Sequence, residues 1–346
     1  MKKFNGSLLT IAALMACCAF VSNFATANFE EEQPTKSKLT YKSYMKWNIL
    51  LPKETFTPAV GSIKVGSGFK TEIDGMALAI DCNADGKVDE KAKGTGGIVT
   101  LKGKQADGSK FKYTVRLVND GGWKWATSGA LEGKVNGVKV RIIDQNNNGR
   151  FNDFGEDAIC VGKSLTASFL SRVINAKGQL VEIEIDSNGD EISYKPYTGK
   201  AGLLNLRSKF KANAKLEAAI VVSENGDYSF NLANAKKGLL IPEGLYTVKS
   251  GKIAMGKETA LIKEGISKPI RVTADEPAVF AWGGPVRAEF TYDRNGEEVT
   301  FSPQNLSFYG KAGEEYHTWI PTGAPPKFVI KDAKGREITQ AKFGAS

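Results

Sequence analysis

Short stretches rich in β-branched and aromatic residues recur along the chain after residue 38, and in two of them, 111–118 and 180–185, apolar and polar positions alternate. Alternation with a period of two predicts strands, and helical periodicity is nearly absent. Further strands are expected at 98–102, 138–143 and 216–222. Turn dipeptides separate these stretches: Asp107-Gly108, Lys177-Gly178, Asn188-Gly189, Asn225-Gly226, Asn295-Gly296 and Lys334-Gly335.

The density of turns predicts an all-β protein. The chain has 346 residues and 37 glycines, and its length suits two or three domains of roughly 100–150 residues each. We expect β-sandwiches rather than a propeller, because no repeat of about 40–50 residues is present. The expected segments are 1–27 as a signal peptide, 28–38 as a flexible leader, 39–207 as a β-rich domain with Asp/Asn/Gly loops, 208–267 as a β-sandwich module and 268–346 as a further sandwich segment.

The stretch Ile241-Pro-Glu-Gly-Leu-Tyr-Thr-Val248 sets a turn with Pro and Gly before an alternating strand that begins at Tyr246. It resembles the P-x-G-x-Y-x-V strand of transthyretin-like (prealbumin-like) and collagen-binding-type β-sandwich modules. The resemblance implies such a module at 208–267. Strand-turn pairs around residues 293–296 and 332–335 suggest that 268–346 is either a separate immunoglobulin-like (Ig-like) sandwich or the rest of the same one.

The N-terminus has the features of a secretory signal peptide. Lys2 and Lys3 precede a mostly apolar run from Leu8 to Val21, and Ala25-Thr26-Ala27 is an A-x-A cleavage pattern. As an alternative, Leu14-Met15-Ala16-Cys17 resembles the lipobox of bacterial lipoproteins, which implies lipidation of Cys17 and an outer-membrane lipoprotein. Both routes predict a secreted or cell-surface protein. No later stretch reaches the roughly 18 apolar residues of a transmembrane helix.

Charge and histidine usage exclude several function classes. The formal net charge of +9 comes from isolated lysines rather than a basic block, which argues against a nucleic-acid partner. His317 is the only histidine, so His-rich zinc sites and an H-E-x-x-H protease are excluded, and a Ser-His-Asp triad would need this residue. We interpret His317 as a strand-surface residue and expect a non-catalytic protein. After the signal region, Cys82 and Cys160 either form a disulfide or stay free.

Two segments place Asp, Asn and Gly directly after a strand in the pattern D-x-[DN]-x-[DN]-G-x-h, and they resemble the first eight positions of an EF-hand or dockerin calcium loop. We call 81–89 the first loop and 144–153 the second loop. The implied Ca²⁺ ligands are side-chain oxygens at positions 1, 3 and 5 and the carbonyl at position 7: Asp81, Asn83, Asp85 and Lys87 in the first loop, and Asp144, Asn146, Asn148 and Arg150 in the second.

Both loops depart from the family at position 12, which is Ala92 or Gly155 instead of a carboxylate. A different carboxylate must therefore close each shell: Asp89 or Glu90 in the first loop, and Asp153, or with less support Asp157, in the second. The apolar residue at position 8, Val88 or Phe151, is expected to anchor its loop in the core.

Asp, Asn and Gly are also the residues of ordinary tight turns. A third segment, Asp186–Asp190, is short and is interpreted as a hairpin. The first two loops place four such residues within nine or ten positions at the ligand spacing, which favours a structural calcium site, since calcium accepts six to eight oxygens in flexible geometry.

Trp123 and Trp125 are two residues apart and share one face of a strand. Core packing is the favoured interpretation, and an exposed sugar-stacking platform is the alternative. The sequence thus predicts a secreted, non-catalytic, calcium-binding β-sandwich protein of the cell surface, with an adhesion or matrix-binding role and a polysaccharide or surface protein as partner. The alternatives are a carbohydrate-binding module and an accessory protein of polysaccharide processing, in which acidic loops would frame a pair of carboxylates.

Overall fold

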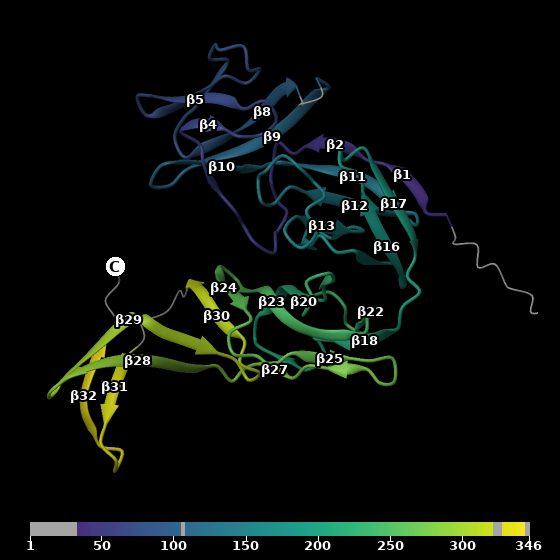
Figure 1. Ribbon diagram of the computed structural model, residues 1–346. Coiled ribbons are helices and arrows are strands. Elements are labelled where there is room, and N and C mark those ends of the chain that lie inside the picture. Colours follow the sequence, from purple (N-terminus) through teal and green to yellow (C-terminus); the bar gives the residue numbers. More distant parts are fainter. Residues whose placement is uncertain (1–32, 105–107, 321–326, 343–346) are drawn as a thin grey trace, which may run out of the picture. The chain divides into compact units, whose positions relative to one another are not determined.

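The computed structural model describes residues 33–104, 108–320 and 327–342. Within these ranges it consists of strands, turns and loops without a helix, so the all-β prediction is confirmed (Figure 1). Among these residues no helix could cross a membrane. The residues from Pro34 onward form one compact unit. The expected signal peptide, Cys17 and Asp107 lie outside the described residues.

Four antiparallel sheets precede residue 200. The first is β4 (Gly61–Ile63), β5 (Phe69–Asp74), β6 (Ala77–Ile80) and β7 (Glu90–Ala92); the second is β3 (Thr57–Pro58), β10 (Trp123–Thr127), β9 (Lys110–Asn119) and β8 (Gly96–Lys104). The third is β14 (Ser168–Phe169), β13 (Ala158–Val161), β12 (Val138–Ile143), β11 (Gly129–Val135) and β2 (Thr40–Ser43), and the fourth is β1 (Thr35–Lys38), β17 (Glu191–Pro196), β16 (Gln179–Ile185) and β15 (Val173–Ala176).

The largest sheet lies after residue 200. Its order is β21 (Ser229–Asn231), β20 (Lys215–Ser223), β23 (Gly244–Met255), β24 (Glu258–Lys263), β30 (Glu315–Ile320), β29 (Glu298–Tyr309) and β28 (Arg287–Asn295), and β25 (Ile270–Val272) also pairs with β23. Smaller sheets are β22 (Leu239–Pro242), β18 (Ala201–Asn205) and β26 (Ala278–Val279); β19 (Phe210–Lys211) and β27 (Trp282–Gly283); and β31 (Lys327–Lys331) and β32 (Glu337–Lys342).

The apolar positions of these strands form cores between pairs of sheets. Phe69 of β5 and Tyr113 of β9 belong to one cluster, and Ile142 of β12 and Ile183 of β16 belong to another. A buried side chain of this size stabilises the fold by about 1.5–3 kcal/mol relative to an exposed one. Sheets that pack face to face over shared apolar side chains are what the alternating sequence pattern predicts.

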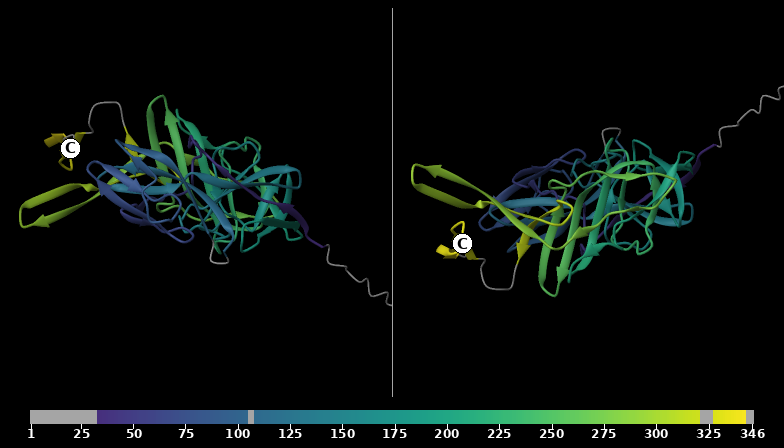
Figure 2. Two further views of the ribbon diagram at one scale, coloured as in Figure 1. Left: turned by 90° about the horizontal axis from the view of Figure 1, so that it is seen from above. Right: turned by 90° about the horizontal axis from the view of Figure 1, so that it is seen from below.

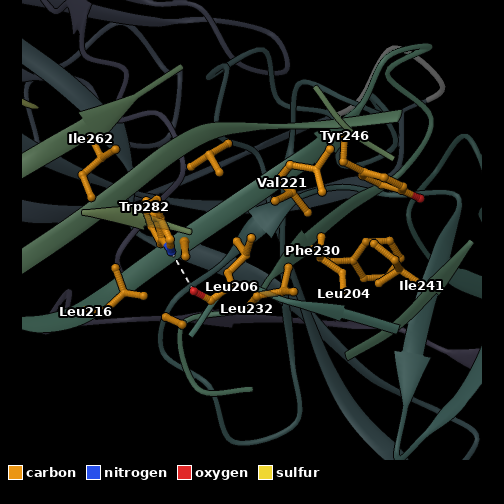
Figure 3. Packing of buried hydrophobic residues seen from close by; sticks show 14 of the residues in the cluster. Leu204, Leu206, Leu216, Val221, Phe230, Leu232, Ile241, Tyr246, Ile262 and Trp282 are labelled. Carbon is orange, nitrogen blue, oxygen red and sulfur yellow. Dashed lines mark hydrogen bonds between the residues drawn. The ribbon is translucent and has the colours of Figure 1, made fainter. Parts of the chain in front are cut away.

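A third core consists mostly of residues after position 200 and joins the large sheet to the smaller ones (Figure 3). Trp282 is fully buried in it, and its Nε1 donates to the Leu206 carbonyl at 2.6 Å. Val173 and Leu180 belong to the same cluster, so this core contains residues from both sides of position 207. The large sheet likewise contains strands from both sides of position 267. The division of the chain into domains at these two positions stays a prediction.

Local sequence signals place several turns and strand starts. Lys177 and Gly178 both adopt left-handed φ angles, 56° and 92°, in the two-residue turn between β15 and β16. A left-handed conformation at both central positions defines the type I′ hairpin turn. Tyr246 begins the inward alternation of β23 as expected, and its hydroxyl donates to the Pro242 carbonyl at 2.9 Å.

One expectation for the N-terminal region is wrong. Residues 35–38, assigned to a flexible leader, form β1, in which Thr35 pairs with Tyr194 and Lys38 with Glu191 of β17. Lys36 adds an ion pair to Glu191 at 2.7 Å. The polar composition suggested disorder, but the edge of β17 supplies main-chain partners that local composition does not reveal.

Candidate functional site

The second loop wraps around the carboxylate of Asp144, which directly follows β12 and is completely buried. Its Oδ1 accepts the main-chain N–H of Asn148 at 3.1 Å, and its Oδ2 accepts that of Gly149 at 2.6 Å. The buried Tyr113 hydroxyl donates to Oδ2 at 2.6 Å. These donors stabilise the ionised carboxylate and fix the loop around position 1.

Three side chains of the second loop converge at its open side. The Nδ2 groups of Asn146, at 3.1 Å, and of Asn148 both donate to Oδ2 of Asp153. The Oδ1 of Asn146 accepts the main-chain N–H of Asn148 at 3.2 Å, and Oδ1 of Asn148 accepts that of Arg150 at 2.8 Å. Positions 3 and 5 and the expected closing carboxylate are therefore brought together as the sequence predicted.

Asp157, the less favoured closing residue, is also buried but has a different role. Its Oδ1 accepts the main-chain N–H of Gln145 at 3.3 Å, and its Oδ2 accepts that of Asp153 at 3.1 Å. Burial, followed by the nearby charge of Asp144, raises the pKa of Asp157 to about 9. This carboxyl group therefore supports the backbone of the loop at Gln145 and Asp153.

The other two carboxyl groups differ in their surroundings. Burial raises the pKa of Asp144 to about 6, although its hydrogen-bond donors oppose that effect. Burial also acts to raise the pKa of Asp153, but the amides of Asn146 and Asn148 and the charge of Arg150 outweigh it, so this pKa is lower than usual. Asp153 is ionised at neutral pH, and the proximity of buried carboxyl groups is an electrostatic cost that a cation would reduce.

The second loop also fixes distant segments of the first half of the chain. Asn147, at position 4, has a left-handed φ of 63°. Its Oδ1 accepts the main-chain N–H of Thr127 at 2.9 Å, and its Nδ2 donates to the Thr55 carbonyl at 3.0 Å. Gln145 accepts the main-chain N–H of Lys53 at 3.0 Å. These roles were not predicted from the sequence; an Asn at a turn position that tolerates left-handed φ was the available signal.

The first loop repeats the same backbone arrangement. Oδ2 of Asp81 accepts the N–H of Gly86 at 2.7 Å, and its Oδ1 accepts that of Asp85 at 3.2 Å. The φ angles at positions 4 and 6 are 59° and 87°, against 63° and 84° in the second loop. Two segments far apart in the chain thus fold in the same way because they share the spacing of Asp, Asn and Gly.

Asp89 completes the first loop. The Nδ2 of Asn83 donates to Oδ2 of Asp85 and to Oδ1 of Asp89, both at 3.2 Å, and the other oxygen of Asp89 accepts the N–H of Cys82 at 2.7 Å. Oδ1 of Asp85 accepts the main-chain N–H of Lys87 at 2.9 Å. Glu90 instead lies in β7 and is exposed, so the geometry favours Asp89 of the two closing residues that the sequence left open.

The two loops differ in burial. Phe151 packs against two core clusters, as expected for position 8. The corresponding expectation for Val88 is wrong: this side chain is 45% exposed, because the first loop precedes the edge strand β7 and faces solvent. Asn83, Asp85, Lys87 and Asp89 are exposed as well. The second loop is therefore the better insulated of the two sites.

The donor set of both loops consists of oxygen atoms, which suits a hard cation such as calcium. Among the described residues, no group of three or more His, Cys, Asp or Glu side chains is arranged to hold a metal ion. An ion in either loop would accordingly rely on amide and main-chain oxygens beside the carboxylates. Asn83, Asn146 and Asn148 each turn Nδ2 toward the point of convergence and Oδ1 toward a main-chain N–H. To present an oxygen to an ion, each amide would have to rotate and give up that main-chain hydrogen bond.

The third Asp/Asn/Gly segment is the hairpin that the sequence predicted. It joins β16 to β17, with the Gly189 N–H donating to the Asp186 carbonyl at 3.1 Å. The N–H of Glu191 donates to Oδ1 of Asp186 at 2.9 Å. This carboxylate caps a turn and has no converging amides of the kind seen at Asp89 and Asp153.

The cysteines take the unpaired alternative. Cys82 and Cys160 are both buried free thiols, and they belong to different core clusters. Burial raises the pKa of each thiol to about 12, with nearby carboxylates adding to the effect at Cys82. A disulfide would require the first loop, which contains Cys82, to meet β13, which contains Cys160, and sequence spacing could not decide this.

The aromatic pair and the histidine also have structural positions. Trp123 and Trp125 of β10 are 5% and 1% exposed, and Trp125 packs edge-on to Tyr113. The core interpretation is therefore confirmed, and the sugar-stacking platform is wrong for these two rings. His317 lies half-buried on β30 with Nδ1 3.1 Å from Oγ1 of Thr318, and burial followed by the charge of Lys263 lowers its pKa.

Comparisons of the chain with protein-family models, curated proteins and solved structures found no match in any of the three.

Proposed function

We propose that the protein is a secreted, non-catalytic β-sandwich protein that binds Ca²⁺ through its first and second loops and acts at a cell surface in adhesion or matrix binding. The observation that carries the calcium proposal is the second loop. There, the buried carboxylate of Asp144 is held by main-chain donors while Asn146, Asn148 and Asp153 converge on one point. The same arrangement recurs in the first loop around Asp89.

In the second loop, Asp144 and Asp153 would supply two carboxylates, Asn146 and Asn148 two amide oxygens, and Arg150 its main-chain carbonyl. Water completes such shells to the six to eight oxygens that calcium takes. A bound divalent cation would offset the repulsion between the carboxylates of Asp144 and Asp153. Because the ligands lie within ten residues, the ion would fix the conformation of the loop.

The role that we propose for the ion is structural. The second loop contacts Lys53, Thr55 and Thr127 through Gln145 and Asn147. Fixing the loop would fix these segments, which lie next to β3 and in β10. The second loop is the more buried, so its ion would be better shielded from competing water. The first loop has two exposed carboxylates, Asp85 and Asp89, beside the buried Asp81.

The wider proposal extends the sequence arguments. Export follows from the N-terminal pattern, and the immunoglobulin-like or transthyretin-like character of the second half follows from the strand at Tyr246. A non-catalytic role follows from the histidine usage and motifs of the sequence. The partner class that we propose is a polysaccharide or a surface protein. We do not propose a carbohydrate-binding module based on Trp123 and Trp125, since both rings are buried.

The test is a thermal melt of the purified protein in EDTA and in calcium. A ligand that binds only the folded state stabilises it by mass action, by about 2.7 kcal/mol at 100 times its Kd. Calcium should therefore raise the melting midpoint, and Asp153→Asn should remove most of that rise. Asp153 is preferable to Asp144 as the site of substitution because it makes fewer main-chain contacts.

The matched control is Asp186→Asn, which changes the carboxylate of the third segment and should leave the calcium shift unchanged. Asp85→Asn tests the first loop separately, because it should remove only the part of the calcium shift that comes from that loop. Superimposed melts of the unsubstituted protein in EDTA and in saturating calcium would show that both loops are turns without an ion.

A further inference from the structure

The strand β28 is the outer edge of the largest sheet within the described part of the chain. All nine of its residues are exposed. Its neighbour β29 pairs with β30 only at Phe308 and Tyr309 among the described residues. Most of the β28–β29 hairpin consequently extends as a two-stranded ribbon, yellow-green in Figures 1 and 2.

The ribbon has an apolar and a polar face. Residues two apart on a strand share a face, so Ala288, Phe290 and Tyr292 lie on one side of β28. The rings of Phe290 and Tyr292 are 43% and 56% exposed. Leu306 and Phe308 of β29 are the register partners of Phe290 and Ala288 and continue this face, up to a register shift between Phe290 and Tyr292. The opposite face of β28 is polar and consists of Arg287, Glu289, Thr291 and Asp293.

A two-stranded hairpin is marginally stable in water, and three or more strands with an apolar face are needed for independent stability. An open edge presents a row of main-chain donors and acceptors that can pair with another strand. We propose that β28 pairs antiparallel with β28 of a second copy of this chain. The two ribbons then form one four-stranded sheet around a two-fold axis.

The sequence of β28 selects one register for this pairing. Opposed residues must lie on the same face, so the two-fold axis must pass through a residue and not between two residues. With the axis at Phe290, Arg287 lies opposite Asp293 of the second copy, and this ion pair occurs twice. An axis at Thr291 would oppose Glu289 to Asp293, and an axis at Glu289 would oppose two copies of that glutamate. Like charges directly opposite one another destabilise a sheet.

The same register also matches the apolar face. The two Phe290 rings lie opposite each other, and each Tyr292 lies opposite Ala288, which leaves room for the larger ring. Cross-strand aromatic pairs stabilise antiparallel sheets. Arg287 now pairs with Glu289 on its own strand at 2.6 Å, and its guanidinium has five N–H donors, enough to bind a second carboxylate. Charge and apolar complementarity thus indicate a second copy as the occupant of this edge.

Sedimentation velocity on the full chain over a series of concentrations tests the proposal. The unsubstituted protein should pass reversibly from monomer to dimer. Arg287→Asp and Asp293→Arg each replace two ion pairs by two like-charge contacts, and each should weaken the dimer on the order of tenfold. The double variant restores both pairs with the signs exchanged and should recover the dimer. An equimolar mixture of the two single variants should form a mixed dimer.

Arg271→Asp is the matched control, since it reverses an exposed charge on β25 of the same sheet. It should leave the dimer unchanged. Equal melting midpoints would show that every variant is folded. A protein that stays monomeric at all concentrations overturns the proposal. A dimer that resists both single changes, or one that the double variant does not recover, assigns dimerisation to a different surface and overturns it equally.

Discussion

Removing the Tyr113 hydroxyl isolates the most buried hydrogen bond of the second loop. In Tyr113→Phe the ring remains, with its packing against Trp125 and Phe151, while the donor at 2.6 Å from Oδ2 of Asp144 is lost. Both side chains are essentially inaccessible to solvent, so water cannot replace the donor without rearrangement. A hydrogen bond to a charged group contributes about 1.5–3 kcal/mol. We therefore expect the free energy of unfolding to fall by about that amount at neutral pH.

The assay is urea unfolding of the purified protein in EDTA, with the substituted and unsubstituted proteins measured side by side. Tyr194→Phe is the control, because its half-buried ring lies on β17 at the edge of another core. This control should change the free energy of unfolding by no more than about 0.5 kcal/mol. Equal stability of Tyr113→Phe and the unsubstituted protein would refute the reasoning, since it would mean that Asp144 does not depend on this donor.

Three further predictions concern other buried polar groups. Asn147→Ala should lower the free energy of unfolding in urea by about 1–2 kcal/mol more than Asn147→Gly does, because only Gly adopts a left-handed φ without strain. Equal losses in the two variants would contradict this. Burial keeps the pKa of Glu314 above its usual 4.5 although Gly283 and other groups donate to it. An acid with a raised folded pKa binds more protons when folded, so its contribution to stability is complete below the unfolded pKa and is lost as pH rises through the folded pKa. The unfolding free energy should therefore fall as pH rises above 4.5, and Glu314→Gln should flatten that slope; parallel pH profiles would contradict the assignment. Trp282→Phe should cost about 2–4 kcal/mol in urea unfolding, from lost volume and the lost bond to Leu206, and a loss below about 1 kcal/mol would be inconsistent with this core.

Much of the candidate site could be predicted from sequence because its hydrogen bonds are local. The carboxylates of Asp81 and Asp144 each accept main-chain N–H groups four and five residues ahead. Such contacts depend only on the spacing of Asp, Asn and Gly. For each loop the sequence offered two candidates for the closing carboxylate, since the path of the chain after position 8 depends on the strand that follows. Whether an ion binds remains a prediction.

The sequence by itself determined the all-β class, strand β12 at Val138–Ile143 and the turn at Asp186, because period-two alternation and turn chemistry act over a few residues. Only the tertiary structure decided that Trp123 and Trp125 are buried, that Val88 is exposed and that residues 35–38 form an edge strand. Burial and edge pairing depend on which sheet lies opposite a given face, and that sheet comes from a distant part of the chain. For the same reason the roles of Tyr113 and Asn147 became visible only when β9 and the segment at 55–57 were brought to the second loop.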